Sequence, residues 1–146
     1  EDELEADDLL GIWATDPTFH AGAKKIIVSI DKDMKTVPCY LWNQLHPEHG
    51  VLKVSKKEAD KNHYMQTLMG DATDGYAGCP SYGPTKSRRL IDSFSLEDEP
   101  AWDKIVGAYK KQGLTEEDAL VQARLARILR VENFDRHKKT IKLWTP

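Results

Sequence analysis

Residues 100–131, PAWDKIVGAYKKQGLTEEDALVQARLARILRV, mark the point where the hydrophobic period of the chain changes. Gly113 is a residue that favours the end of a helix, and Thr115 opens a pattern similar to a capping box. The segment therefore predicts two capped helices, 99–112 and 115–131. In the first of them the apolar residues recur at helical spacing: Trp102, Ile105, Val106 and Tyr109.

The part of the chain before these helices has the short apolar runs of a β-rich fold. Residues 24–30 (KKIIVSI) are β-branched and bounded by turn residues, which predicts a buried strand. After the helices, residues 139–145 (KTIKLWT) alternate and predict a last strand. We expect an α+β fold in which a curved antiparallel sheet or small β-barrel over residues 9–95 is closed by the two helices. Its further strands are expected at 36–42, 51–55, 63–69 and 88–94.

Length and composition predict one domain over residues 1–146. The chain is 40% hydrophobic and 31% charged, as ordinary globular proteins are. Residues 1–8 (EDELEADD) hold six carboxylates and are expected to be a flexible, acidic lead-in. The net charge of −3 argues against a dedicated nucleic-acid binder, because such proteins usually carry a basic surface. No apolar run reaches the roughly 20 residues of a membrane span.

Cys39 and Cys79 are 40 residues apart and lack the C-x-x-C spacing of zinc and redox sites. Two interpretations stay open, a disulfide between them and a pair of buried free thiols. The chain begins without Met, which fits a mature protein whose leader has been removed, although a shortened chain explains the same fact. The resulting expectation is a secreted, periplasmic or luminal protein.

Three short features resemble lipocalins and the wider calycin group: G-x-W at 11–13, T-D-x-Y at 73–76, and an arginine that follows, Arg88 or Arg89. The resemblance implies a barrel that begins at the G-x-W motif. In such a barrel Trp13 fills the floor and one of the two arginines stacks on its ring. The resemblance also implies that the barrel binds a small, mainly apolar molecule.

The segment LHPEHG at 45–50 places two histidines near a glutamate. A loop can bring His46 and His49 to one metal ion, with Glu48 or His63 completing the site. Pro47 excludes the helical H-E-x-x-H geometry, and histidines in a loop are more often simply solvated. We therefore predict no metal site.

The first functional hypothesis is binding of a small, mainly apolar ligand in the concavity of the sheet. Aromatic side chains commonly line such pockets. The residues expected to contact the ligand are Tyr40, Trp42, Tyr64 and Tyr76.

Two alternatives stay open. One is an enzyme of the isomerase or lyase kind that uses acid–base residues in the same pocket, with His63, Tyr64 and Asp92 as candidates. The other is a protein-binding accessory or inhibitor module, with an exposed patch around Trp144. No P-loop, dinucleotide fingerprint or G-x-S-x-G motif is present, and no cofactor or nucleic-acid partner is predicted.

Overall fold

The computed structural model describes residues 4–94 and 100–146. Its contacts divide the chain into two compact units. The first unit comprises Glu1–Asp60 and Ile128–Leu143, and the second comprises Lys61–Arg127 and Trp144–Pro146. None of the described helices is long and apolar enough to cross a membrane.

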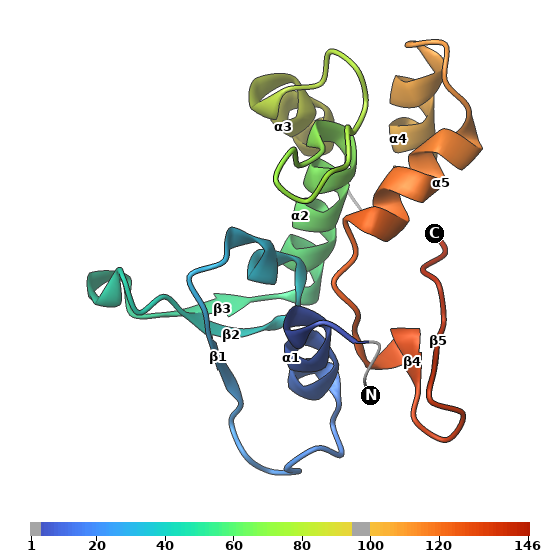
Figure 1. Cartoon of the computed structure of the whole chain (residues 1–146). Coiled ribbons are helices and arrows are strands. Elements are labelled where there is room, and N and C mark those ends of the chain that lie inside the picture. Colours follow the sequence, from blue (N-terminus) through green and yellow to red (C-terminus); the bar gives the residue numbers. More distant parts are fainter. Residues whose placement is uncertain (1–3, 95–99) are drawn as a thin grey trace. The chain divides into compact units, whose positions relative to one another are not determined.

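The first unit contains a three-stranded sheet in the order β1 (Ile26–Val28), β2 (Cys39–Trp42), β3 (Val51–Val54) (Figure 1). β1 pairs with β2 in parallel, whereas β2 pairs with β3 in antiparallel orientation. Parallel neighbours need a crossover rather than a tight hairpin. The 3₁₀ helix η1 (Lys32–Thr36) lies in that crossover.

The helix α1 (Ala6–Thr15) packs against the segment that contains the 3₁₀ helix η3 (Val131–Asn133). A Cβ atom on Gly11 would lie 2.3 Å from the Leu129 carbonyl oxygen, so only glycine permits this approach. Side chains of α1 accept two backbone N–H groups across the contact. Asp8 bonds the Leu129 nitrogen at 2.9 Å and Thr15 Oγ1 bonds the Val131 nitrogen at 2.8 Å.

A buried ion pair ties three segments of the first unit together. Arg130 is only 2% exposed, and its Nη1 lies 2.7 Å from Asp60 Oδ1. Its Nη2 donates to the Thr36 carbonyl oxygen at 2.7 Å. Met34 of η1 contributes to a small apolar core that also contains Ile27, Val37 and Leu41. The unit is completed by an antiparallel pair, β4 (Phe134–Asp135) with β5 (Thr140–Ile141).

The second unit is helical. It takes in most of α2 (Lys56–Met69), then α3 (Pro84–Asp92), α4 (Ala101–Lys110) and α5 (Glu116–Leu125). α2 begins with a capping box, in which Ser55 Oγ accepts the Glu58 N–H at 3.2 Å and Glu58 Oε2 accepts the Ser55 N–H at 2.8 Å. The fully buried part of its core includes Leu68, Ile105, Tyr109, Ala119 and Ala123.

The α+β class is confirmed, and helices α4 and α5 lie where two helices were expected near the C-terminus. The prediction of helix up to residue 131 is wrong, because α5 ends at Leu125. Residues 95–99, where the first of them was expected to begin, lie outside the described residues, as do residues 1–3 of the acidic lead-in. Residues 6–8 of that lead-in form the first turn of α1. The strand expected at 139–145 is shorter than predicted and is limited to Thr140–Ile141.

The barrel is wrong, because the sheets of the described residues have three strands and two strands and neither closes. The strand expected at 63–69 is helical in α2, and residues 88–92 of the strand expected at 88–94 are helical in α3. The buried positions of α2 include Ala59, His63 and Thr67, four residues apart. Because two of these three are polar, hydrophobicity alone does not reveal the helical period.

Candidate functional site

Two aspartates of the first unit lie just beyond β1. Asp31 and Asp33 follow the carboxyl end of a strand that pairs in parallel with β2. Asp31 caps η1 by accepting the Asp33 N–H at 2.8 Å, and both side chains are partly exposed. Ligand-binding residues of open α/β sheets commonly lie beyond the carboxyl ends of the strands.

Two aspartates of the second unit lie on the 70–78 loop, whose backbone is firmly held. Asp71 exchanges two backbone hydrogen bonds with Tyr76, at 2.9 and 3.0 Å. The Gly78 N–H donates to Gln122 Oε1 at 2.8 Å. Asp74 is exposed and Asp71 is partly exposed. The loop thus presents carboxylates from a backbone that hydrogen bonds fix in place.

Asp71 and Asp74 each offer a carboxylate oxygen, and these atoms lie within 4.8 Å of one another, which suits a hard divalent cation. Carboxylate oxygens are the protein ligands that Mg²⁺ and Mn²⁺ prefer, and the imidazole and thiolate groups that favour other metals are not part of either pair. A cation held in this way polarises a phosphoryl oxygen and lowers the pKa of a bound water.

Helix α3 follows the loop, and its exposed side carries three basic residues together with Asp92. Ser87 and Ile91 are buried, whereas Lys86, Arg88 and Arg89 are exposed. Lys86 Nζ lies 4.0 Å from the centre of the Tyr82 ring, a cation–π contact. Exposed Lys and Arg on one helix face are the groups that contact nucleic-acid phosphates.

The residues predicted as acid–base candidates all belong to the second unit. His63 is 1% exposed, its Nε2 lies 2.8 Å from the Ala123 carbonyl oxygen, and its ring meets the edge of Trp144 at 5.0 Å. Tyr64 is half-buried and packs against the same core. Asp92 is exposed at the end of α3, and its carboxylate lies 3.7 Å from Lys61 Nζ.

The residues predicted to line a ligand pocket fall in both units. Tyr40 and Trp42 are two residues apart on β2 in the first unit, and both are half-buried. Lys24 Nζ lies 4.2 Å from the centre of the Tyr40 ring. Tyr76 is buried in the 70–78 loop of the second unit.

The residues given structural roles by the lipocalin resemblance lie on helices. Trp13 is in α1, 36% exposed and stacked on Phe19 with ring centres 5.2 Å apart. Arg88 and Arg89 are exposed on α3. The G-x-W motif therefore opens no strand.

The disulfide considered for Cys39 and Cys79 is wrong, because both are free thiols. Burial raises the pKa of each to about 11. Both groups are therefore protonated at neutral pH and are weak nucleophiles.

None of the four aspartates was predicted to bind a metal ion, and Asp74 was considered only as part of the T-D-x-Y motif. A signal for the first pair was present, because Asp31 and Asp33 directly follow the run predicted as a buried strand. For the second pair the signal was the density of glycine around Asp71 and Asp74, since glycine allows the close backbone approaches that hold such a loop.

Comparison with known proteins gives two phage enzymes. The chain is 36% identical to "Exodeoxyribonuclease" of Enterobacteria phage T3 and 34% identical to "Exonuclease" of Escherichia phage T7. Each alignment has 174 positions and takes in 100% of this chain and 57% of the relative. The chain thus spans little more than half the length of either. No family model and no solved structure matches it.

These likenesses correct the functional predictions. The lipocalin resemblance is wrong, and so are the apolar ligand, the isomerase or lyase alternative and the inhibitor module, because both relatives are exonucleases. The exclusion of a nucleic-acid partner is wrong for the same reason. The expectation of a secreted, periplasmic or luminal protein, which followed from the missing N-terminal Met, is also overturned, because it conflicts with the phage exonuclease relatives.

Proposed function

We propose that this chain is part of a nuclease that hydrolyses phosphodiester bonds of DNA. The observation that carries the proposal is the 36% identity to a phage exodeoxyribonuclease, which extends over the whole of this chain. The chain spans 57% of that relative. We therefore propose the activity for the whole protein to which this chain belongs.

The aspartate pairs supply the chemistry that this reaction needs. We assign Asp31 and Asp33 in the first unit, and Asp71 and Asp74 in the second, to binding divalent cations. Hydrolysis of a phosphodiester requires an activated water and compensation of the charge that develops on the phosphoryl oxygens. A carboxylate-bound cation supplies both, and the carboxylates fix its position.

The basic face of α3 supports binding of the substrate. Lys86, Arg88 and Arg89 are exposed within six residues of Gly83, shortly after the 70–78 loop. They offer positive charge to the DNA backbone, which carries no sequence information, and this suits an enzyme that acts on many sequences.

The test measures release of nucleotides from end-labelled duplex DNA with Mg²⁺ and with EDTA. We expect Mg²⁺-dependent release, and we expect Asp31→Asn, Asp33→Asn, Asp71→Asn and Asp74→Asn each to lower kcat about a hundredfold or more. Asn keeps the size of the side chain and removes the charge that holds the cation. Asp103→Asn is the matched control, because Asp103 is exposed in the first turn of α4, and its kcat should stay within about twofold of wild type.

Each failure has its own meaning. If the unaltered protein releases no nucleotide from any DNA, the proposed function is wrong. If it is active and the four variants match Asp103→Asn, the nuclease stands and the assignment of the aspartates is wrong. Circular dichroism of every variant excludes loss of folding as the cause of lost activity.

A further inference from the structure

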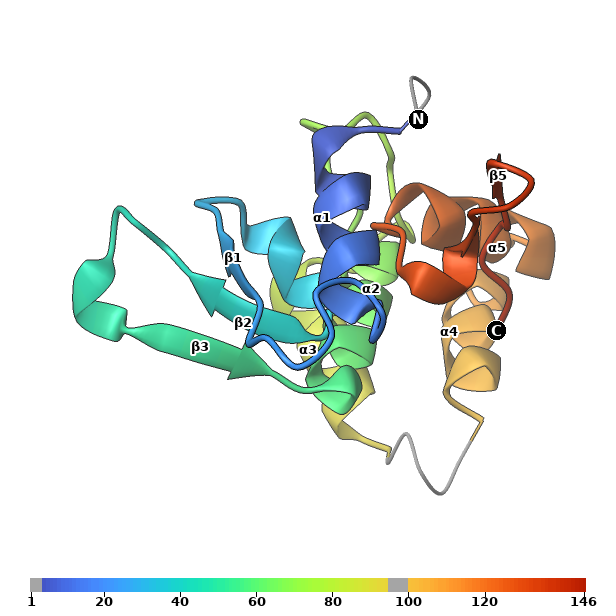
Figure 2. The same ribbon diagram turned by 90° about the horizontal axis from the view of Figure 1, so that it is seen from below.

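The tip of the β2–β3 pair gathers three metal-binding side chains that the proposed nuclease chemistry does not use. His46, Glu48 and His49 lie in and next to the 3₁₀ helix η2 (Pro47–His49), which Figure 2 shows between the two strands. Each residue offers one ligand atom, and these atoms all lie within 4.8 Å of one another. All three side chains are exposed, so an ion can reach them from solvent.

The backbone of the tip brings the two histidines to one side. Residues three apart in a 3₁₀ turn are eclipsed, and His46 and His49 are three apart. The His49 N–H donates to the His46 carbonyl oxygen at 3.1 Å, which closes the turn. The two rings are nearly parallel, with centres 5.3 Å apart and an interplanar angle of 17°. Pro47 therefore excludes a site on an α-helix but fits the first position of this 3₁₀ turn.

The hairpin holds this turn from both ends. The His46 N–H donates to the Asn43 carbonyl oxygen at 3.1 Å, and the Asn43 side chain accepts the Leu45 N–H at 2.9 Å. At the other end Gly50 has φ of +65° and its N–H donates to the Pro47 carbonyl oxygen at 3.1 Å. The ligand residues are thus on a closed, hydrogen-bonded turn between two paired strands.

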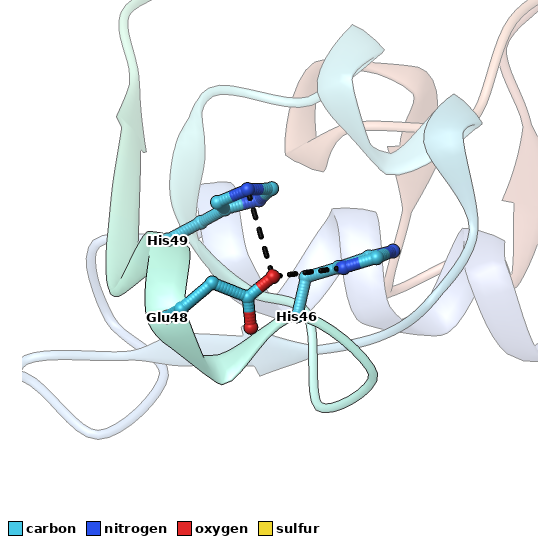
Figure 3. A group of neighbouring side chains, drawn as sticks. All are labelled: His46, Glu48 and His49. Atoms are coloured by element: carbon cyan, nitrogen blue, oxygen red, sulfur yellow. Dashed lines mark hydrogen bonds and ion pairs between the residues drawn. The ribbon is translucent and has the colours of Figure 1, made fainter.

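The distances fit a tetrahedral transition-metal ion. Glu48 Oε1 lies 3.0 Å from His46 Nδ1 and 3.7 Å from His49 Nε2, as the dashed lines of Figure 3 show. Ligand atoms bound to Zn²⁺ at about 2.0–2.1 Å in a tetrahedron lie about 3.4 Å apart. These two separations lie on either side of that value, and the ligand atoms of the two histidines lie within 4.8 Å of each other. Because a ring nitrogen binds an ion in the plane of its ring, the two nearly parallel rings turn toward each other when the ion binds.

From this geometry we propose that His46, Glu48 and His49 form a binding site for Zn²⁺ and related first-row transition-metal ions. Two imidazoles and one carboxylate form a ligand set that proteins use for Zn²⁺, with a water in the fourth position. Imidazole also separates this site from the aspartate pairs, whose all-oxygen ligands favour Mg²⁺ and Mn²⁺. Binding replaces the present contacts between Glu48 and the two rings by bonds to the ion and holds the tip of the hairpin in one conformation.

The experiment titrates the whole chain, free of any polyhistidine tag, with Zn²⁺ against a chromophoric chelator. We expect one Zn²⁺ per chain at this site. His46→Asn, His49→Asn and Glu48→Gln should each lower the affinity at least about tenfold, because each removes one of three ligands. His137→Asn is the matched control, since His137 is an exposed histidine of the same unit away from the tip, and it should bind as the wild type does.

A second measurement locates the ion. In ¹H–¹⁵N spectra of the imidazoles, Zn²⁺ should shift the signals of His46 and His49 and leave those of His20 and His137 in place. Equal affinity of the wild type and the three variants overturns the proposal, and so does a shift confined to other histidines. Neither readout depends on nuclease activity, so this proposal and the proposed function fail separately.

Discussion

Asp60 is a partly buried carboxylate whose charge state is coupled to the stability of the first unit. Burial raises its pKa, but the hydrogen bond from Lys56 and the positive charge of Arg130 outweigh burial, so the net pKa is lowered. A carboxyl group with a lower pKa in the folded than in the unfolded chain stabilises the fold above its unfolded pKa. That contribution is lost as the pH falls through the folded pKa.

We therefore expect the effect of Asp60→Asn to depend on pH. At pH 7 the substitution leaves the buried Arg130 guanidinium without a counter-charge, which should lower the free energy of unfolding by about 3 kcal/mol. In acid the wild-type carboxyl group becomes neutral as well, so the difference between the two proteins should shrink. Urea denaturation across the pH range measures both.

Asp92→Asn is the control for that experiment, because Asp92 is 59% exposed and 3.7 Å from its lysine partner. Its effect should stay below about 1 kcal/mol at every pH. A constant difference between wild type and Asp60→Asn from neutral pH to acid would contradict the linkage argued for Asp60.

At the scale of the element, the 70–78 loop is the part of the second unit whose shape depends most on glycine. Gly78 has φ of +68°, and a Cβ atom there would lie 2.3 Å from the Gly70 nitrogen. The positive φ of Gly78 and the closeness of the Gly70 backbone both exclude a side chain at position 78. The two ends of the loop that carries Asp71 and Asp74 can approach each other only because of this.

Gly78→Ala should therefore destabilise the second unit by about 3 kcal/mol or more, because it adds a backbone clash to the cost of a left-handed conformation. Gly75→Ala tests the conformational cost alone, since Gly75 has φ of +79° and a Cβ atom there would have no neighbour within 4 Å. It should cost about 1–2 kcal/mol. Thermal unfolding followed by circular dichroism compares them, and equal losses would show that the close approach is unimportant.

At the scale of the whole molecule, the last residues return to the second unit after the chain has completed the first. Trp144 meets the rings of His63 and Trp102 at 5.0 and 5.4 Å. Its carbonyl oxygen accepts a hydrogen bond from Arg124 Nε at 3.2 Å. The C-terminal segment is therefore part of the core of this unit and not an appendage.

Trp144→Ala should loosen the helices of the second unit. We expect amide hydrogen exchange in α4 and α5 to become at least about tenfold faster, because the aromatic contacts that oppose local opening are lost. Leu143→Ala is the control, because Leu143 is next to Trp144 in the chain and its side chain is 62% exposed. Exchange in this variant should change by less than about twofold. Unchanged exchange in Trp144→Ala would show that the C-terminal residues do not stabilise this unit.

Elements whose signals are local were predictable from the sequence. The Thr115 cap forms as expected, with its hydroxyl and N–H both bonded to Asp118, and the apolar spacing of α4 is matched by its buried residues. The short apolar runs also mark β1, β2 and β3. In each case the pattern within a few residues is enough, because capping and amphipathic burial depend on neighbours in the chain.

The local patterns were therefore enough to predict an α+β chain with short strands and two helices near its C-terminus, the second of them capped by Thr115. Three features depend on contacts in the folded protein: residues 63–69 and 88–92 are helical, β1 and β2 are parallel, and particular polar groups are buried. His63 and Ser87 are buried because the Ala123 and Tyr82 carbonyl oxygens lie within reach of them. A buried polar group is tolerated only with such a partner. The partner of His63 is 60 residues away in the sequence, so no local pattern reveals it.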